Sequence, residues 1–270
     1  MRTWYLSDLE FIVLRERLLD RGLPWPFSYV GPVRSRIDFL HEKARIWSAL
    51  QANWDPDLAD AIVRAAKPDA RVQIRAWDSS AVIDPKGRYF LIGNRCGSEA
   101  VVVHGYCERH YETYDRYRIV VCDAHELAGV LVDSLPSMPA GTQGRVELMS
   151  YRAETMDHWS GRSTLYDDGD DNVEFRSVRW QSALRTTVGI IDVRQGRSKF
   201  GPQGIVLRRS FWEDHPDDGR YLIDTDPPVA AVGIDAAGLQ ARIDQEIAEV
   251  LRVVQDESQA GIVRSSVFGD

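Results

Sequence analysis

The chain has 270 residues, of which 44% are hydrophobic and 27% are charged, and its formal net charge is −8. This length can bury one sizeable core or two small domains, and the composition is that of an ordinary globular protein. The acidic balance gives no electrostatic reason to expect nucleic acid or an anionic membrane as partner, because binding to either begins with a basic surface.

The N-terminal segment, MRTWYLSDLEF, lacks the apolar run and the small-residue cleavage site of a secretory signal. No stretch approaches the ~20 apolar residues that span a bilayer. We therefore expect a cytoplasmic protein without membrane insertion. The three cysteines, Cys96, Cys107 and Cys122, are an odd number without CxxC spacing, which favours reduced thiols over a disulfide framework.

The first part of the chain is predicted to be helical. A capping box, Ser7 with Glu10, begins a segment with helical apolar periodicity. A second helix is predicted over residues 35–51, where apolar residues again recur at helical spacing. Asp55 and Pro56 then supply the cap and the first turn of a short third helix.

From residue 71 the apolar period changes to two, which is typical of half-buried strands. The predicted strands of this half are RVQIRAW, RYFLIG, EAVVVHGY and RYRIVV. The links between them are short, and short links favour antiparallel pairing because parallel pairing needs a long crossover. Asp123 then caps a helix that we expect to end near residue 132.

The second half repeats this order of elements. Its predicted strands are TTVGIIDV, GIVLRRSFW, GRYLI and VAAVGI, and a helix capped by Asp235 follows to about residue 254. Four residues of the first strand-to-helix junction have counterparts 112 residues further on: Asp123, Ala124, Leu127 and Leu131 correspond to Asp235, Ala236, Leu239 and Ile243. The alternative is coincidence, since many such junctions use an aspartate cap and a leucine one turn later.

We interpret the chain as one domain, residues 1–270, made of two pseudo-repeats at about 1–135 and 144–256. The predicted fold class is α+β. It has a central, mainly antiparallel sheet flanked by helices, two pseudo-symmetric halves that share the sheet, and a C-terminal helix packed on it. The acidic stretch at residues 167–172 is predicted to be a solvated loop.

The sequence contains no complete set of catalytic or metal-binding residues at a recognised spacing. Cys96, His104, Cys107 and His110 are residue types that zinc accepts, but on a strand residues 104 and 107 point to opposite faces. We therefore predict no catalytic residue, no metal and no cofactor. An unrecognised metal enzyme centred on this Cys/His cluster stays as an alternative. A second alternative is a helix-grip-like protein that encloses a small apolar ligand. An internal cavity of several hundred Å³ would support this alternative.

Four segments in this order carry a resemblance to a known family: FIVLRERLLDRGLPWPFSYV, GRYFLI, LPSMPAGTQGRVEL and DDGRYLI with the following VGIDAAGLQARI. Over about residues 8–252 the chain resembles the EspG family, cytosolic chaperones of mycobacterial type VII (ESX) secretion. The resemblance implies two pseudo-symmetric halves around a shared sheet. It also implies binding to the tip of the PPE subunit of a PE–PPE heterodimer, which keeps that partner soluble before export, with self-association as a possibility for the free protein.

The resemblance implies that the sheet surface and the C-terminal helical region bind the partner. An interface of standard size would bury about 800 Å² of each protein. Aromatic and basic side chains anchor such interfaces. The predicted contacts are Trp77 and Tyr106 from the first unit and Lys199, Phe200, Arg209 and Trp212 from the second. Phe200 would be an apolar anchor, while Lys199 and Arg209 would contact polar or acidic groups. The alternative for each residue is packing within the sheet or an ordinary solvated charge.

Overall fold

The computed structural model describes residues 1–29, 35–110, 113–148, 173–225 and 227–267. The helices are α1 (Asp8–Leu19), α2 (Arg36–Ala52), α3 (Pro56–Ala65), α4 (Leu127–Val132), α5 (Val173–Ser182) and α6 (Ala236–Val267). The strands are β1 (Arg2–Ser7), β2 (Ala70–Asp78), β3 (Arg88–Cys96), β4 (Glu99–Tyr106), β5 (Arg116–Asp123), β6 (Arg145–Glu147), β7 (Thr187–Gln195), β8 (Leu207–His215), β9 (Gly219–Asp224) and β10 (Ala230–Gly233).

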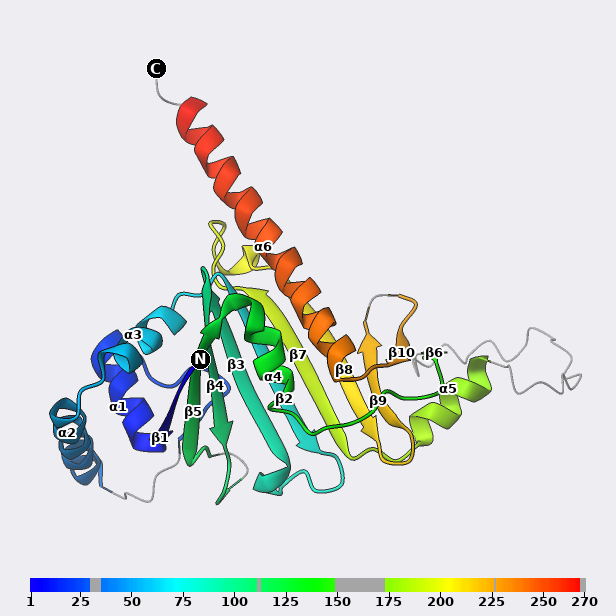
Figure 1. The fold of residues 1–270 in the computed structure, drawn as a ribbon, viewed down its shortest axis with the longest axis horizontal. Coiled ribbons are helices and arrows are strands. Elements are labelled where there is room, and N and C mark those ends of the chain that lie inside the picture. Colours follow the sequence, from blue (N-terminus) through cyan, green and yellow to red (C-terminus); the bar gives the residue numbers. More distant parts are fainter. Residues whose placement is uncertain (30–34, 111–112, 149–172, 226, 268–270) are drawn as a thin grey trace, which may run out of the picture.

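All of these strands form one sheet, in the order β1-β5-β4-β3-β2-β7-β8-β9-β10-β6. Neighbouring strands pair antiparallel throughout this order. Helices lie on both faces of the sheet (Figure 1). The predicted α+β class, with a mainly antiparallel sheet and a C-terminal helix packed on it, is therefore confirmed.

The predicted helix starts are formed as the sequence indicates. In α1 the backbone N–H of Ser7 donates to Glu10 Oε2 at 2.8 Å, and the backbone N–H of Glu10 donates to Ser7 Oγ at 3.3 Å. In α3, the Asp55 carboxylate accepts hydrogen bonds from two backbone N–H groups of the first turn. These side chains satisfy donors that the helix itself leaves without a partner.

The second predicted helix also forms, as α2, but its apolar side chains are less buried than the spacing indicates. Ile37 is 66% exposed and Leu40 is 51% exposed, whereas Ile46 is buried. Helical periodicity identified this helix correctly, but it did not show how little of the helix the rest of the protein covers.

Alternation along the strands gives the sheet two faces, which we name by the helices that pack on them. On the α6 face, side chains such as Val72, Ile74 and Val193 are buried against α4 and α6. On the α1 face, side chains such as Phe90, Ile92 and Ile119 are buried against α1 and α3. Successive residues of a strand therefore serve two separate cores.

The apolar residues of the two strand-to-helix junctions meet on the α6 face. Leu127 and Leu131 of α4, and Leu239 and Ile243 of α6, are all 0% exposed and belong to one cluster. The strands β2 and β7, which correspond to the first predicted strand of each half, lie side by side near the middle of the sheet. The division of the chain into two pseudo-repeats stays a prediction. The shared core is compatible with it, because both junctions contribute equivalent apolar residues to one cluster.

Several elements differ from the sequence prediction. The strand β1, at one edge of the sheet, and the helix α5 were not predicted. The helix α6 continues to Val267, well past residue 254, and projects beyond the sheet (Figure 1). Among the described helices, none combines the length and apolar character needed to cross a membrane. The predicted acidic loop at 167–172 lies outside the described residues.

A carboxylate ties the β8–β9 turn to the segment that precedes β6. Asp218 accepts hydrogen bonds from the backbone N–H and hydroxyl of Thr142, both at 2.7 Å, from Gln143 Nε2 at 3.0 Å and from the Tyr221 hydroxyl. Burial alone would raise the pKa of Asp218, but these hydrogen bonds outweigh it and lower the pKa to about 2.

We expect Asp218→Asn to lower the melting temperature at neutral pH and to have little effect near pH 2. An aspartate in the unfolded chain titrates near pH ~4, so ionised Asp218 stabilises the fold above that pH, and this contribution is lost as the pH falls towards 2. Thermal unfolding of both proteins between pH 2 and 7 tests this. Asp217→Asn, at an exposed neighbouring position, is the matched control. A difference that stays constant over the pH range would contradict the assignment.

Candidate functional site

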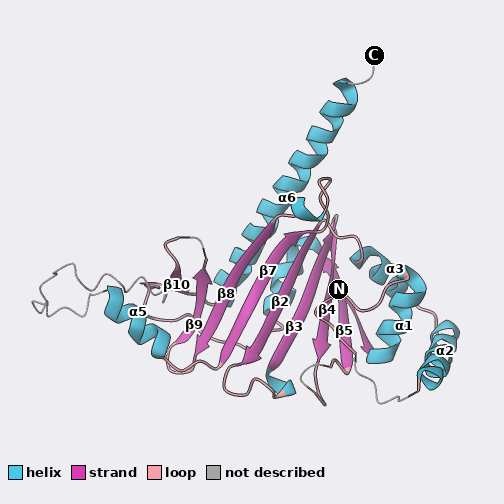
Figure 2. Ribbon diagram, turned by 180° about the vertical axis from the view of Figure 1, so that it is seen from behind, coloured by secondary structure: helices cyan, strands magenta, loops and turns pink. Residues whose placement is uncertain are grey.

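On the α1 face, the described helices cover the two ends of the sheet and leave its centre uncovered (Figure 2). Helices α1 and α3 pack over β3, β4 and β5, and α5 packs beside β6, β9 and β10. Between them, alternate residues of β2, β7 and β8 point outwards. We call this surface the open face and define it by seven residues: Arg75, Trp77, Val188, Ile190, Asp192, Arg209 and Phe211.

Four side chains of the open face are apolar and only half buried: Trp77, Val188, Ile190 and Phe211. They are neighbours across the strands, because Trp77 pairs with Val188 and Ile190 pairs with Phe211. None of the four belongs to the hydrophobic clusters formed by the described residues. A contiguous apolar surface without a cover is typical of a protein-binding site.

The open face also carries an ionic network. Arg209 donates to Asp192 from Nε at 2.6 Å and from Nη2 at 2.9 Å, and Arg75 Nη2 lies 3.3 Å from the same carboxylate. The hydrogen bond with Asp192 raises the pKa of Arg209. Asp192, only 4% exposed, thus pairs with the guanidinium groups of both Arg209 and Arg75. The Arg75 guanidinium lies 4.7 Å from the ring centroid of Trp25, which is 60% exposed at the border of this face.

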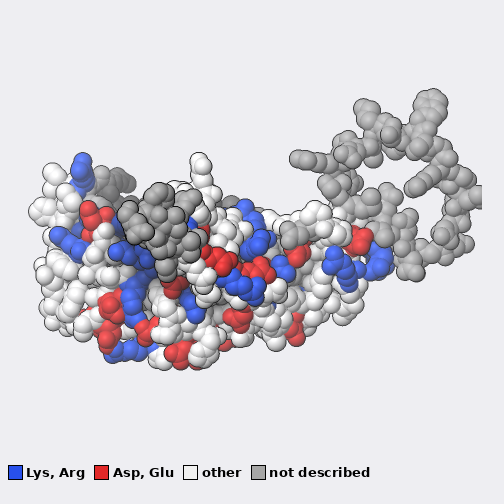
Figure 3. All heavy atoms as spheres, turned by 90° about the horizontal axis from the view of Figure 1, so that it is seen from above, with Lys and Arg blue, Asp and Glu red and all other residues white. Residues whose placement is uncertain are grey.

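Basic and acidic side chains are mixed over the surface seen from above (Figure 3). Among the described residues in this view they occur in small groups of both signs. A continuous basic stripe, which nucleic-acid binding needs, is not seen in this described part of the surface.

Two of the predicted contact residues, Trp77 and Arg209, lie on the open face. Lys199 and Phe200 lie in the connection between β7 and β8, where Phe200 is 65% exposed. This connection is bound to α6, because the Lys199 backbone N–H donates to Glu257 Oε2 at 3.0 Å and Lys199 Nζ donates to the Glu257 carbonyl at 2.7 Å. The structure therefore places Phe200 beside the projecting helix rather than over the open face.

The structure does not place Trp212 or Tyr106 on this surface. Trp212 is 0% exposed in the core of the α6 face, where its indole occupies the space that a side chain at Gly189 would need. It is three residues after Arg209 on one strand, so the two side chains point to opposite faces. We therefore remove Trp212 from the contact set. Tyr106 also lies on the face opposite Trp77, stacked on His104 with ring centroids 4.1 Å apart.

The sequence prediction missed five residues of the open face: Arg75, Val188, Ile190, Asp192 and Phe211. Alternation in RVQIRAW and TTVGIIDV does place Arg75 and Ile190 on one side of their strands. The sequence does not reveal that α1, α3 and α5 leave this part of the sheet uncovered, because that depends on how far each helix reaches over the sheet.

The Cys/His cluster considered for zinc is divided between the two faces. His104 lies on the α6 face, whereas Cys107 is buried in the cluster of the α1 face. Burial raises the pKa of Cys96 to about 11 and of Cys107 to about 12, so both thiols are protonated at neutral pH. Protonated thiols are poor nucleophiles and poor metal ligands. Burial lowers the pKa of His104 to about 4, and Arg118 contributes to this decrease.

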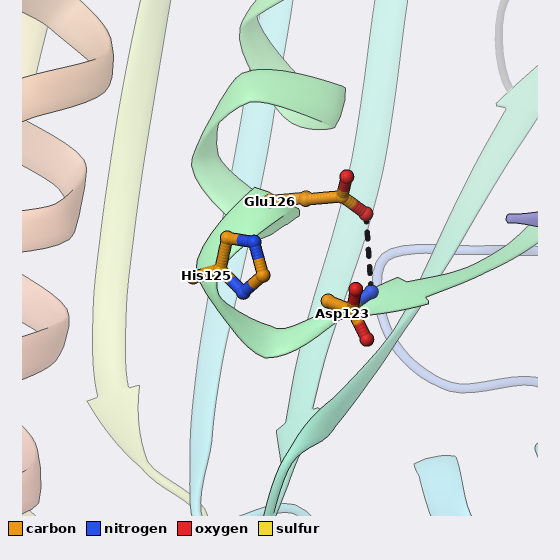
Figure 4. A group of neighbouring side chains, drawn as sticks. All are labelled: Asp123, His125 and Glu126. Atoms are coloured by element: carbon orange, nitrogen blue, oxygen red, sulfur yellow. Dashed lines mark hydrogen bonds between the residues drawn. The ribbon is translucent and has the colours of Figure 1, made fainter.

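Asp123, His125 and Glu126 bring their ligand atoms within 4.8 Å of one another in the described structure (Figure 4). All three are exposed, and Glu126 Oε2 accepts the backbone N–H of Asp123 at 3.2 Å. This bond caps the helical segment that leads into α4, as the sequence predicted for Asp123. Helix capping therefore explains the arrangement without a metal ion.

The alternative of an enclosed apolar ligand depends on space between the sheet and its helices. The cavity between α1, α3 and the α1 face measures about 20 Å³, which corresponds to a single water-sized particle. Two hollows of about 380 and 430 Å³ lie at other places and are lined largely by polar and charged residues. A third, of about 360 Å³, has a mostly apolar lining that includes Ile12, Leu23 and Phe39, but it lies between α1, α2 and the segment after α1 and not between the sheet and its helices. In the described part of the chain, the space between sheet and helices does not fit the ligand-binding alternative.

The family model for EspG matches residues 7–255 of the chain. No curated protein matches the chain. Among solved structures, the chain is similar to the Mycobacterium tuberculosis type VII secretion system chaperone EspG5, whose structure was determined in complex with a PE25–PPE41 dimer. The two chains are 14% identical, with a TM-score of 0.53, and the similarity covers 90% of this chain and 95% of that chain. At this identity the similarity concerns the fold.

Proposed function

Because this chain belongs to the EspG family, we propose that it is a chaperone of a type VII secretion system that binds a PE–PPE heterodimer. The support is the family match over most of the chain, together with a fold similar to that of a chaperone solved with such a dimer. The protein acts by binding rather than by catalysis. It works in the cytoplasm, before the dimer is exported.

The open face is the proposed contact surface, and the tip of the PPE subunit is the proposed occupant. The observation that carries this is the half-buried state of Trp77, Val188, Ile190 and Phe211. An exposed apolar tip promotes aggregation, and covering it with this apolar strip would remove both surfaces from water. Arg75 and Arg209 would contact polar or acidic groups around the tip. Lys199 and Phe200 would extend the contact towards α6.

Co-expression with PE–PPE pairs tests the proposal. We expect a stable 1:1:1 complex with at least one pair, measured by size-exclusion chromatography with light scattering, and aggregation of the same pair without the chaperone. In that complex, hydrogen exchange should slow in β2, β7 and β8. Failure to bind any PE–PPE pair would contradict the function. Binding with protection confined to the α6 face would instead contradict the contact surface.

A further inference from the structure

Two arginines line the narrow cavity between α1, α3 and the α1 face: Arg15 of α1 and Arg71 of β2. Arg15, which is only 8% exposed, donates from Nε to the Gly22 carbonyl at 2.9 Å. Arg71 donates from Nε to Asn94 Oδ1 at 2.8 Å and from Nη2 to the Ala65 carbonyl at 3.3 Å. All three acceptors are neutral. Among the described residues, neither guanidinium forms an ion pair.

Both arginines remain charged at neutral pH. The pKa of each is lowered to about 10. Burial is the main cause for both, with a smaller contribution from Arg21 for Arg15 and from Arg194 and Arg15 for Arg71. Arg194 stands directly opposite Arg71 on β7 and has no carboxylate partner within the described structure. A pKa of about 10 leaves Arg15 and Arg71 protonated at pH 7. Positive charges therefore lie close together in this part of the protein.

Arg71 is half-buried. Besides Arg15, the other arginine that is buried in the described structure is Arg220, and it has a carboxylate partner. Arg220, at 1% exposed, is held by the Asp214 carboxylate at 2.7 and 2.9 Å, and Asp214 itself is 0% exposed. Burying a charge without an opposite charge is strongly unfavourable, so proteins pair such groups. The pair of Arg15 and Arg71 lacks the carboxylate that this rule requires.

We propose that the cavity between Arg15 and Arg71 binds a small inorganic anion, chloride in the cell. The Nη nitrogens of Arg15 make no hydrogen bond within the described structure, so their N–H groups are available to an anion, as is Nη1 of Arg71. The volume of about 20 Å³ admits a particle of the size of water or a halide and is too small for phosphate or sulfate. Apolar walls that include Ile92 and Val103 lower the local dielectric and strengthen the attraction.

The anion would stabilise the segment that follows α1. Pro24 lines the cavity and Gly22 accepts from Arg15, while the next residue, Trp25, stacks on Arg75 at the border of the open face. An ion bound only by the folded chain shifts the equilibrium towards that state. The stability of the protein therefore depends on the identity of the anion in the buffer, and not only on ionic strength.

Thermal unfolding in sodium chloride and in sodium gluconate of equal ionic strength tests this, because gluconate is too large for the cavity. At chloride concentrations about ten times the Kd we expect a melting temperature roughly 3–5 °C higher than in gluconate. A crystal soaked in bromide should show an anomalous peak between the two guanidinium groups. Equal melting temperatures in the two salts, with no such peak, would overturn the proposal.

Arg71→Met is the variant that separates this site from general salt effects. It removes one of the two guanidinium groups and should abolish the difference between chloride and gluconate. Arg45→Met, which removes an exposed arginine paired with Glu42 on α2, should keep the difference. If both variants keep it, chloride acts elsewhere and the proposal is wrong. If Arg71→Met does not fold, the wild-type salt comparison and the bromide peak still decide.

Discussion

Replacing Asp214 with alanine is expected to lower the free energy of unfolding by about 3–5 kcal/mol. The Arg220 guanidinium donates to both oxygens of this carboxylate, and the two side chains are 1% and 0% exposed. Without Asp214, Arg220 keeps a hydrogen bond to the Pro136 carbonyl but loses its only counter-ion among the described residues. A buried charge without an opposite charge then destabilises the folded state, which urea denaturation followed by circular dichroism measures.

Two further variants show whether the loss comes from the uncompensated charge. Asp60→Ala breaks an ion pair with Arg64 whose carboxylate is 63% exposed, and should cost less than about 1 kcal/mol. The double variant Asp214→Leu with Arg220→Met removes both charges and should recover most of the stability. A loss below about 1 kcal/mol for Asp214→Ala would show that Arg220 finds water or another partner in its place.

Local sequence signals predicted most of the secondary structure. The capping box of Ser7 and Glu10, the proline after Asp55 and the aspartate before α4 each determine a helix start through a few neighbouring atoms. Alternation in RVQIRAW and short strand-like runs elsewhere predicted eight of the ten strands of the described residues. In β3 and β4 burial is continuous rather than alternating, because both faces of these strands are covered. The edge strands β1 and β6 are short and mostly exposed, so they give little alternation.

The candidate site was predicted less well because it depends on tertiary structure. Trp77 and Arg209 were selected as aromatic or basic residues among charges, and both lie on the open face. Trp212 met the same criterion but fills the core beside Gly189. Strand periodicity alone separates Arg209 from Trp212, because residues three apart on a strand point to opposite faces. The extent of helix cover over the α1 face is not encoded in any local pattern.

Replacing Phe211 with aspartate is expected to weaken binding of a PE–PPE heterodimer at least about 100-fold. Phe211 is half buried on the open face beside Ile190, with Glu213 two residues further along the same strand and on the same face. A new carboxylate there would have to be desolvated against an apolar partner, next to a charge of the same sign. The dissociation constant, measured by biolayer interferometry with purified dimer, checks this, and thermal unfolding checks that the monomer is intact.

Phe200→Asp and Tyr106→Asp compare the open face with the other predicted contacts. Tyr106 lies on the opposite face of the sheet, so Tyr106→Asp should bind as the wild type does. Phe200 lies on the connection tied to Glu257, and its variant should weaken binding less than Phe211→Asp if this connection only extends the interface. The reverse order, with Phe200→Asp abolishing binding and Phe211→Asp leaving it intact, would place the partner on α6 and its neighbouring loop. The half-buried strip of β2, β7 and β8 would then need another explanation.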